Sequence, residues 1–289
     1  MSRDGHLIVR HENLISETTD VAVRPKFADR KTEKTIDGET LEGWFAEDFT
    51  LAELKSLRAR ERLPHLRRAS AAFDGREPIL SFDEVIAIAR EGSARTGRSI
   101  GVYPELKHPT HLKSEGLDAE AALVAVLQRE GWTGADAPVF VQCFEVGTLE
   151  RLATKIATPR IQLIAAATGP ADRADLTPAA MTAPAGLAAI AAYAAGIGVD
   201  KALVIPRTAD GRLGAPSSLV ADAHKAGLAV HAWTFRAENH FLPIDLRRGE
   251  PAAAHGDLGA DLKAFYAAGV DAVFSDFTAA AVAARTAKA

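Results

Sequence analysis

The sequence predicts an α/β fold, with a TIM-type (β/α)8 barrel as the favoured architecture. From residue 80 onward, continuous apolar runs alternate with helical segments at short spacing, which is typical of a parallel sheet buried on both faces. Each run ends in a polar residue, and catalytic groups supplied by many different strand ends are typical of a barrel. Six such strands are two fewer than a barrel needs, so a doubly wound sheet remains an alternative, although no Gly-rich phosphate loop follows any strand.

The helices and strands after residue 80 follow a regular order. Helices are predicted at residues 81–97, 117–131, 146–156, 182–196, 216–227, 257–269 and 278–288, and strands at 99–107, 137–144, 160–167, 201–206, 228–235 and 271–277. Ser81 and Glu84 form a capping box at the first helix. Four helices end in the glycine expected at that place: Gly131, Gly196, Gly227 and Gly269. The polar residues at the strand ends are Glu105 and Lys107, Gln142, Arg207, His231 and Thr234, and Asp276.

Residues 12–79 break this order, because they are polar and rich in turn-forming residues. We interpret them as an insertion that decorates one end of the barrel, within a single domain of residues 1–289. The insertion has one clear helix, which begins after Thr50 with Glu53 completing a capping box. It has too few apolar residues to predict a core of its own. Its basic stretch, residues 58–70, is interpreted as a solvated face or a loop.

Composition and charge exclude several classes of protein. Hydrophobic residues make up 47% and charged residues 25% of the chain, as in soluble globular proteins. The formal net charge of −4 predicts no nucleic-acid partner, and no apolar run approaches the ~20 residues of a membrane span. Cys143 is the single cysteine, so no internal disulfide is expected, and we predict that it is a small buried residue.

The stretch IGVYPELKHPTH, residues 100–111, raises the question of function. Strand alternation places Glu105 and Lys107 on one face. Opposite charges at the end of a buried strand are unfavourable unless they pair, bind a metal or face a polar cleft. From the residues alone, a structural ion pair and a functional site are equally good interpretations of Glu105 and Lys107.

Several motifs in a fixed order resemble the glycerophosphodiester phosphodiesterases, most of all the periplasmic branch that scavenges glycerol phosphates. DGHLIVRHENLISETTDVA resembles the segment that carries a catalytic His, and IGVYPELKHP resembles the family's metal-binding Glu-x-Lys strand. WFAEDFTLAELKSL, VFVQCFEVGTLERL, VHAWTFRAEN and GVDAVFSDF resemble other family segments in order. The resemblance implies a TIM-type barrel of the phospholipase C-like phosphodiesterase kind. It also implies metal-dependent hydrolysis of glycerophosphodiesters to glycerol 3-phosphate and an alcohol.

The resemblance assigns roles to particular residues. It implies that His11 is catalytic and that Glu105 is one carboxylate ligand of a divalent metal, Ca²⁺ or Mg²⁺. It implies substrate-binding positions at Lys107, Gln142, Phe144 and Trp233. In such a mechanism two His side chains act as general base and general acid across the phosphorus, and Glu105 and Lys107 face metal and phosphate more than each other. Glu12 stands where the family usually has Asp.

The remaining His residues and Asp276 receive weaker assignments. We expect His108 and His111 at the surface or the pocket rim, because the family uses carboxylates as metal ligands there. His231 is expected in the core or the pocket wall. For Asp276, capping of the last helix and lining of the pocket are equally good interpretations.

The family's first strand carries His-Arg-Gly and its second strand a Glu-x-Asp pair, and neither motif is present in this sequence. We therefore expect the chain to lack the first strand, the first helix and most of the second strand, and its activity to be impaired. The alternative is a non-catalytic barrel remnant or a partner-binding fragment. The expected partner is a small glycerophosphodiester, the oligomeric state is open, and the family branch predicts a periplasmic or secreted location although no signal peptide is present.

Overall fold

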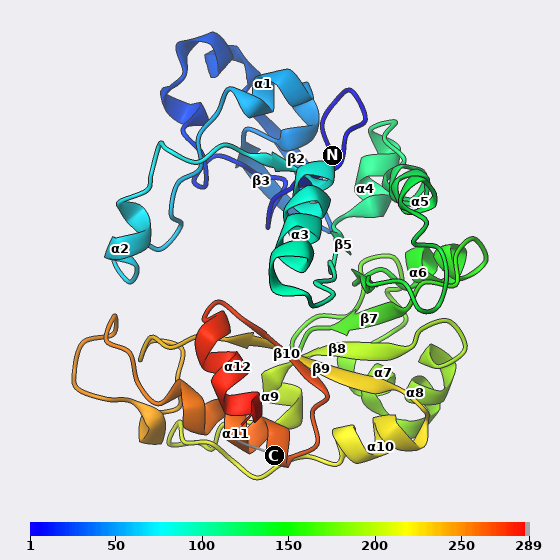
Figure 1. Cartoon of the computed structure of the whole chain (residues 1–289), viewed down its shortest axis with the longest axis vertical. Coiled ribbons are helices and arrows are strands. Elements are labelled where there is room, and N and C mark those ends of the chain that lie inside the picture. The colour runs from blue at the N-terminus through cyan, green and yellow to red at the C-terminus, as the bar shows by residue number, and fades with distance from the viewer. Residues whose placement is uncertain (287–289) are drawn as a thin grey trace. The chain divides into compact units, whose positions relative to one another are not determined.

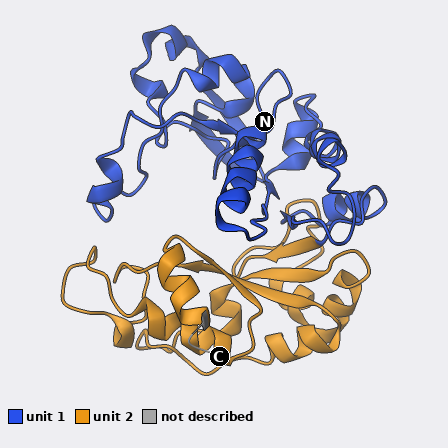
Figure 2. Ribbon diagram, viewed as in Figure 1, with its two compact units in different colours: residues 1–159 blue, residues 160–289 orange. Residues whose placement is uncertain are grey.

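The computed structural model describes residues 1–286 (Figure 1). It consists of two compact units, the first Met1–Pro159 and the second from Arg160 onward (Figure 2). None of the described helices is long and apolar enough to cross a membrane.

Unit 1 holds most of the short elements of the chain. Its strands are β1 (Ile8–Val9), β2 (Thr32–Ile36), β3 (Glu39–Gly43), β4 (Leu80–Ser81), β5 (Glu105–Leu106) and β6 (Val141–Cys143). Its α-helices are α1 (Leu51–Lys55), α2 (Arg68–Ala71), α3 (Phe82–Thr96), α4 (Pro109–Ser114), α5 (Ala119–Glu130) and α6 (Val146–Ala153). Three 3-10 helices complete it: η1 (Val21–Val23), η2 (Pro25–Arg30) and η3 (Ala46–Asp48).

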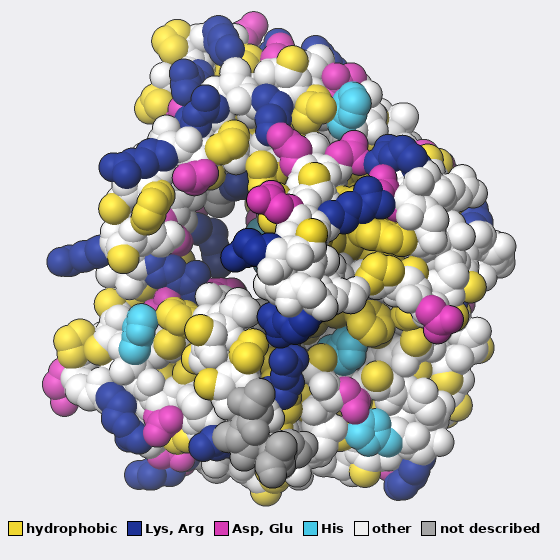
Figure 3. Space-filling model, viewed as in Figure 1, with side chains coloured by type: hydrophobic (Ala, Val, Ile, Leu, Met, Phe, Trp, Pro, Cys, Tyr) yellow, Lys and Arg dark blue, Asp and Glu magenta, His cyan; other side chains and the backbone are white. Residues whose placement is uncertain are grey.

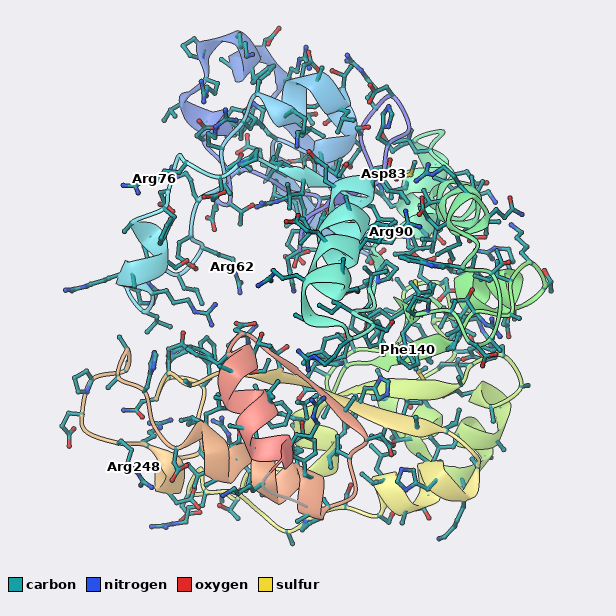
Figure 4. All side chains as sticks on the ribbon, in the orientation of Figure 1. Arg62, Arg76, Asp83, Arg90, Phe140 and Arg248 are labelled. Atoms are coloured by element: carbon teal, nitrogen blue, oxygen red, sulfur yellow. The ribbon has the colours of Figure 1, made fainter. Side chains whose placement is uncertain are left out.

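Helix α3 forms where its capping signal predicts. Ser81 accepts a hydrogen bond from the backbone of Glu84, whose side chain accepts one from the backbone of Ser81, so the predicted capping box is confirmed. The helix ends at Gly97, whose left-handed backbone (φ 66°) suits glycine. Ion pairs join α3 to α5: Arg90 pairs with Glu130 at 2.5 Å and Asp83 pairs with Arg129 (Figure 4).

Strands β5 and β6 are parallel neighbours, and they position the residues of interest. Glu105 is the partner of Gln142 in the register, and Leu106 is the partner of Cys143. A bridge between Val102 and Val139 continues the pairing toward the N-terminal side. Cys143 is 1% exposed, as predicted for a small buried residue.

The insertion has its own hydrophobic core, so the expectation that it has too few apolar residues for one was wrong. The core residues are Ile15, Val21, Phe27, Ala46, Phe49, Leu54, Leu57 and Ile79, each at most 2% exposed. The rings of Phe27 and Phe49 meet edge to face with centroids 5.0 Å apart. Apolar residues that are scattered along this mostly polar segment form a core only when its turns bring them together.

The basic stretch of the insertion leads into α2 and is solvated, as predicted. Arg62 and Arg68 are exposed. In Figure 3, Lys and Arg side chains are frequent on the left, beside α2, and Figure 4 labels Arg62 and Arg76 there. Elsewhere on the visible face, acidic and basic side chains are mixed (Figure 3).

Unit 2 is a parallel sheet with helices between its strands. The strands are β7 (Arg160–Ile164), β8 (Gly196–Asp200), β9 (Ala229–Phe235) and β10 (Ala272–Ser275), each parallel to the next. The helices are α7 (Pro178–Thr182), α8 (Pro184–Ile190), α9 (Lys201–Val204), α10 (Leu219–Lys225), η4 (Ile244–Leu246), α11 (Leu258–Ala267) and α12 (Thr278–Thr286). The pattern of parallel strands and helices confirms the predicted α/β class.

One strand lies elsewhere than predicted. The sequence predicted a strand at residues 201–206 and a helix end at Gly196, whereas the strand is β8 and residues 201–204 form α9. Asp200 accepts a hydrogen bond from the backbone of Ala202 and so begins the helix. A Cβ on Gly196 would lie 2.6 Å from the carbonyl oxygen of Ala229, so this glycine permits close packing of strands and does not end a helix.

Candidate active site

Unit 1 contains a cavity of about 760 Å³ between the ends of β1 and β5 and one face of α3. Part of its wall is apolar and includes three exposed large hydrophobic residues: Val9, Ile88 and Ile100. The other part is polar and contains Arg10, His11, Glu105, Lys107 and Gln142. Four of the six residues assigned by the family resemblance thus line one cavity.

Glu105 and Lys107 are close enough to form an ion pair. Lys107 Nζ lies 3.2 Å from Glu105 Oε1, and the two side chains are 22% and 21% exposed. Glu105 Oε1 is nevertheless buried and has no hydrogen-bond partner within the described chain. The contact with Lys107 is thus an ion pair without hydrogen-bond geometry, and the carboxylate keeps acceptor capacity.

Gln142 provides a second acceptor of the same kind. Its side-chain oxygen is buried without a hydrogen-bond partner among the described residues. Because Gln142 is the register partner of Glu105, the two unsatisfied oxygens arise from neighbouring positions of adjacent strands. Buried acceptors without partners are rare, so a ligand that enters here is expected to supply hydrogen-bond donors or positive charge.

His11 lies at the cavity after β1 and pairs with its neighbour Glu12. The distance from His11 Nδ1 to Glu12 Oε1 is 2.5 Å, and the His11 side chain is 75% exposed. Burial raises the pKa of the Glu12 carboxyl, but the hydrogen bond with His11 and the charge of Lys107 outweigh this and lower it. Glu12 is therefore an ionised partner that orients the imidazole and leaves Nε2 available to a substrate.

The described residues do not form a complete metal site. Ca²⁺ takes about six to eight oxygen ligands and Mg²⁺ six, whereas Glu105 and Gln142 offer one unsatisfied oxygen each. Within residues 1–286, no group of three or more His, Cys, Asp or Glu side chains is arranged to hold a metal ion.

Two assigned residues are not among those that line this cavity. Phe144 follows β6, is half-buried and does not line the cavity. Trp233 belongs to β9 in unit 2, where its indole N–H donates to the carbonyl oxygen of Gly198 at 3.0 Å.

His231 on the same strand is 4% exposed, in line with a residue of the core or pocket wall. Asp276 pairs with Arg236 at 2.9 Å.

Sequence reasoning missed a contact between the insertion and His108, which lies between β5 and α4. His108 Nδ1 lies 2.7 Å from Asp37 Oδ2, which stands in the turn between β2 and β3. An Asp-Gly pair at residues 37–38 is a hairpin signal and was available in the sequence. The sequence did not indicate which residue the hairpin turn would contact.

A second group that sequence reasoning missed is centred on Glu47 and connects the insertion with His111. Glu47 is buried and accepts hydrogen bonds from Asn13 at 3.0 Å and Lys34 at 3.3 Å, and it pairs with His111 at 3.1 Å. This network ties the insertion to α4, which directly follows the Glu-x-Lys strand. His111 thus has a structural partner and is not at the rim.

Comparison with known proteins decides the family. The model of the glycerophosphoryl diester phosphodiesterase family matches residues 1–280. The chain belongs to this family. Its reaction class, phosphoric diester hydrolysis, is confirmed with it. The family match begins at residue 1, so the predicted loss of an N-terminal strand and helix is not confirmed.

Named relatives agree with the family assignment. A glycerophosphodiester phosphodiesterase of Arabidopsis thaliana is 34% identical over 289 residues, a match that covers 96% of this chain and 74% of the relative. One from Treponema pallidum is 28% identical and covers 82% of this chain and 71% of the relative.

Solved structures show the fold of this glycerophosphodiester phosphodiesterase chain. A crystal structure from Silicibacter pomeroyi, assigned to the same family, is 20% identical with a TM-score of 0.62 and covers 96% of this chain and 77% of its own. The glycerophosphodiester phosphodiesterase of Agrobacterium tumefaciens is 17% identical with a TM-score of 0.52 and covers 99% and 83%.

Proposed function

We propose that the polar part of the unit 1 cavity hydrolyses a glycerophosphodiester to glycerol 3-phosphate and an alcohol. The observation that carries this proposal is that three segments far apart in the sequence contribute polar side chains to one cavity: His11, Glu105 with Lys107, and Gln142. In this proposal Phe144 and Trp233 contribute to substrate binding, as the family resemblance implies.

The roles follow from the chemistry of each side chain. His11 Nε2 takes a proton from the attacking water or glycerol hydroxyl, while ionised Glu12 stabilises the imidazolium that forms. Lys107 places its ammonium beside the phosphate and stabilises the negative charge that develops on the phosphoryl oxygens. Gln142 Oε1 accepts a hydrogen bond from a substrate hydroxyl.

A divalent cation, Ca²⁺ or Mg²⁺, is the proposed cofactor, with Glu105 as its one carboxylate ligand from the described residues. Because a single carboxylate binds such ions weakly, we propose that the activity of this chain is impaired relative to a site with three carboxylates. A periplasmic or secreted location, suggested by the family branch, also remains a proposal.

Steady-state hydrolysis of glycerophosphocholine with added Ca²⁺ tests the proposed function. His11→Gln removes the base but keeps a side chain of similar reach, and we expect kcat to fall about 10²–10⁴-fold. His65→Gln is the matched control, because His65 is an exposed histidine of the insertion that does not line the cavity. Equal activity of the two variants would remove His11 from the mechanism.

A further inference from the structure

His108 occupies an unusual position directly after the Glu-x-Lys strand. Its backbone is left-handed (φ 48°, ψ 45°), which turns the chain between β5 and α4. Its contact, Asp37, also has a positive φ of 51°. These two are the non-glycine residues with positive φ within residues 1–286. The positive φ of Asp37 belongs to its Asp-Gly hairpin turn, whereas the left-handed backbone of His108 is uncommon for a residue other than glycine.

The contact joins two separate parts of unit 1. Asp37 lies in the turn of the hairpin formed by β2 and β3, 71 residues before His108 in the sequence. The 2.7 Å distance from Asp37 Oδ2 to His108 Nδ1 fixes the ring and leaves Nε2 for another partner. His108 does not itself line the cavity, but it directly follows Lys107, which does. Its side chain is 24% exposed, so a small molecule can reach it.

The charges that face His108 come from each segment packed around it. Asp37 approaches from the hairpin and Glu12 from the segment after β1, and Lys107 is the residue before His108, while His111 of α4 acts on the same Asp37. Burial lowers the pKa of His108, and Lys107 lowers it further, but Asp37 and Glu12 outweigh both and raise it. His108 therefore keeps its proton to a higher pH than an ordinary histidine does.

His108–Asp37 repeats the arrangement of His11–Glu12. In each pair a carboxylate oxygen lies at Nδ1, at 2.7 Å and 2.5 Å, so that Nε2 is the free nitrogen. Both imidazoles act electrostatically on the same Glu12 carboxylate. Cleavage of a phosphodiester needs one group that accepts a proton and another that donates one.

We propose that His108, positioned by Asp37, is the general acid of this site and protonates the departing alcohol. This inference rests on the proposed function. A water oxygen forms a bond to phosphorus as its proton passes to His11 Nε2. The bond from phosphorus to the alcohol oxygen breaks, its electron pair stays on that oxygen, and the proton of His108 Nε2 joins it. The products are a phosphomonoester and a neutral alcohol, and both imidazoles then exchange protons with water.

The test varies how much the leaving group needs a proton. The alkoxide of choline is a poor leaving group unless it is protonated as it departs, whereas p-nitrophenolate leaves readily as an anion. We expect His108→Gln to lower kcat about 10²–10⁴-fold for glycerophosphocholine. The same variant should change kcat for the p-nitrophenyl ester of glycerol 3-phosphate by less than about tenfold. His65→Gln should leave both rates unchanged.

Asp37→Asn supplies a second measurement that does not remove the imidazole. Because Asp37 raises the pKa of His108, its loss should move the alkaline limb of kcat/KM for glycerophosphocholine to lower pH. Circular dichroism of each variant checks that the fold is retained.

Each outcome decides the matter. A loss in His108→Gln that is selective for the choline ester supports the general acid. An equal loss of kcat on both esters overturns it, because a merely structural or binding role does not depend on the leaving group. The absence of any loss in His108→Gln also overturns it. A wild-type chain that hydrolyses neither ester overturns the proposed function and this inference with it, whereas an active wild type with unselective His108→Gln overturns the inference alone.

Discussion

Replacing Lys107 with methionine separates a structural ion pair from a catalytic one. At the observed 3.2 Å between Lys107 Nζ and Glu105 Oε1, the Coulomb attraction is about 5 kcal/mol for an effective dielectric constant of about 20. Desolvation offsets most of this for side chains about a fifth exposed. The net contribution of the pair to the free energy of unfolding is therefore about 1 kcal/mol.

Two different magnitudes follow for Lys107→Met. The variant leaves the Glu105 carboxylate without its partner in a largely buried place, so we expect a loss of about 1–3 kcal/mol in the free energy of unfolding. That is small enough for the protein to stay folded, since domains of ordinary stability unfold with about 5–15 kcal/mol. The loss of positive charge at the phosphate should lower kcat for glycerophosphocholine about 10²–10³-fold.

The assay combines urea unfolding with initial rates, and a second substitution provides the control. In Glu105→Gln/Lys107→Met no unpaired charge remains, so stability should recover while activity stays low. Lys107→Arg keeps the charge and should retain more activity than Lys107→Met. If Lys107→Met loses stability but keeps its kcat, the pair is structural and Lys107 has no role in the reaction.

Three further predictions concern the metal, the insertion and acid stability. Glu105 alone binds hard cations poorly, so calorimetry should show only millimolar Ca²⁺ or Mg²⁺ affinity; micromolar binding abolished in Glu105→Gln would show that other ligands complete a site. Phe49→Ala in the insertion core should lower the free energy of unfolding by about 3–5 kcal/mol, whereas Phe73→Ala, at a side chain 55% exposed, should change it by less than about 0.5 kcal/mol; equal effects would contradict the core. The Arg30 guanidinium lowers the pKa of the Glu53 carboxyl to about 2 from 4.5, so its stabilisation is present above pH 4.5 and disappears as the pH falls toward about 2. In Arg30→Ala, stability measured by urea unfolding should depend less on pH within that window, and an unchanged profile would show that another group causes the acid sensitivity.

Local signals in the sequence determined the helix starts and the pairing class of the sheet. The capping boxes at Ser81 and Thr50 are confirmed, because the atoms that form them lie within three residues of each other. Continuous apolar runs predicted parallel strands, and the pairs β5–β6 and β7–β8 are parallel. The ordered motifs also led to the correct family.

Local signals failed to predict the structure where a residue type fits two different elements. Gly196 fits the end of a helix as well as the start of a closely packed strand. Only the carbonyl of Ala229 beside it decides between them. The insertion failed in the same way, since Phe27 and Phe49 are 22 positions apart and their contact depends on the turns between them.

The chemistry of the site shows the same division. The sequence by itself determined that a histidine lies beside a carboxylate at residues 11–12 and that Glu105 and Lys107 share one strand end, because these residues are neighbours in the chain. Only the tertiary structure decided that Gln142 stands beside Glu105 and that Asp37 holds His108, because pairing of strands and the reach of a hairpin depend on the packing of distant segments. Contacts between neighbours in the chain follow from the covalent structure, whereas contacts between distant segments form only when the chain folds.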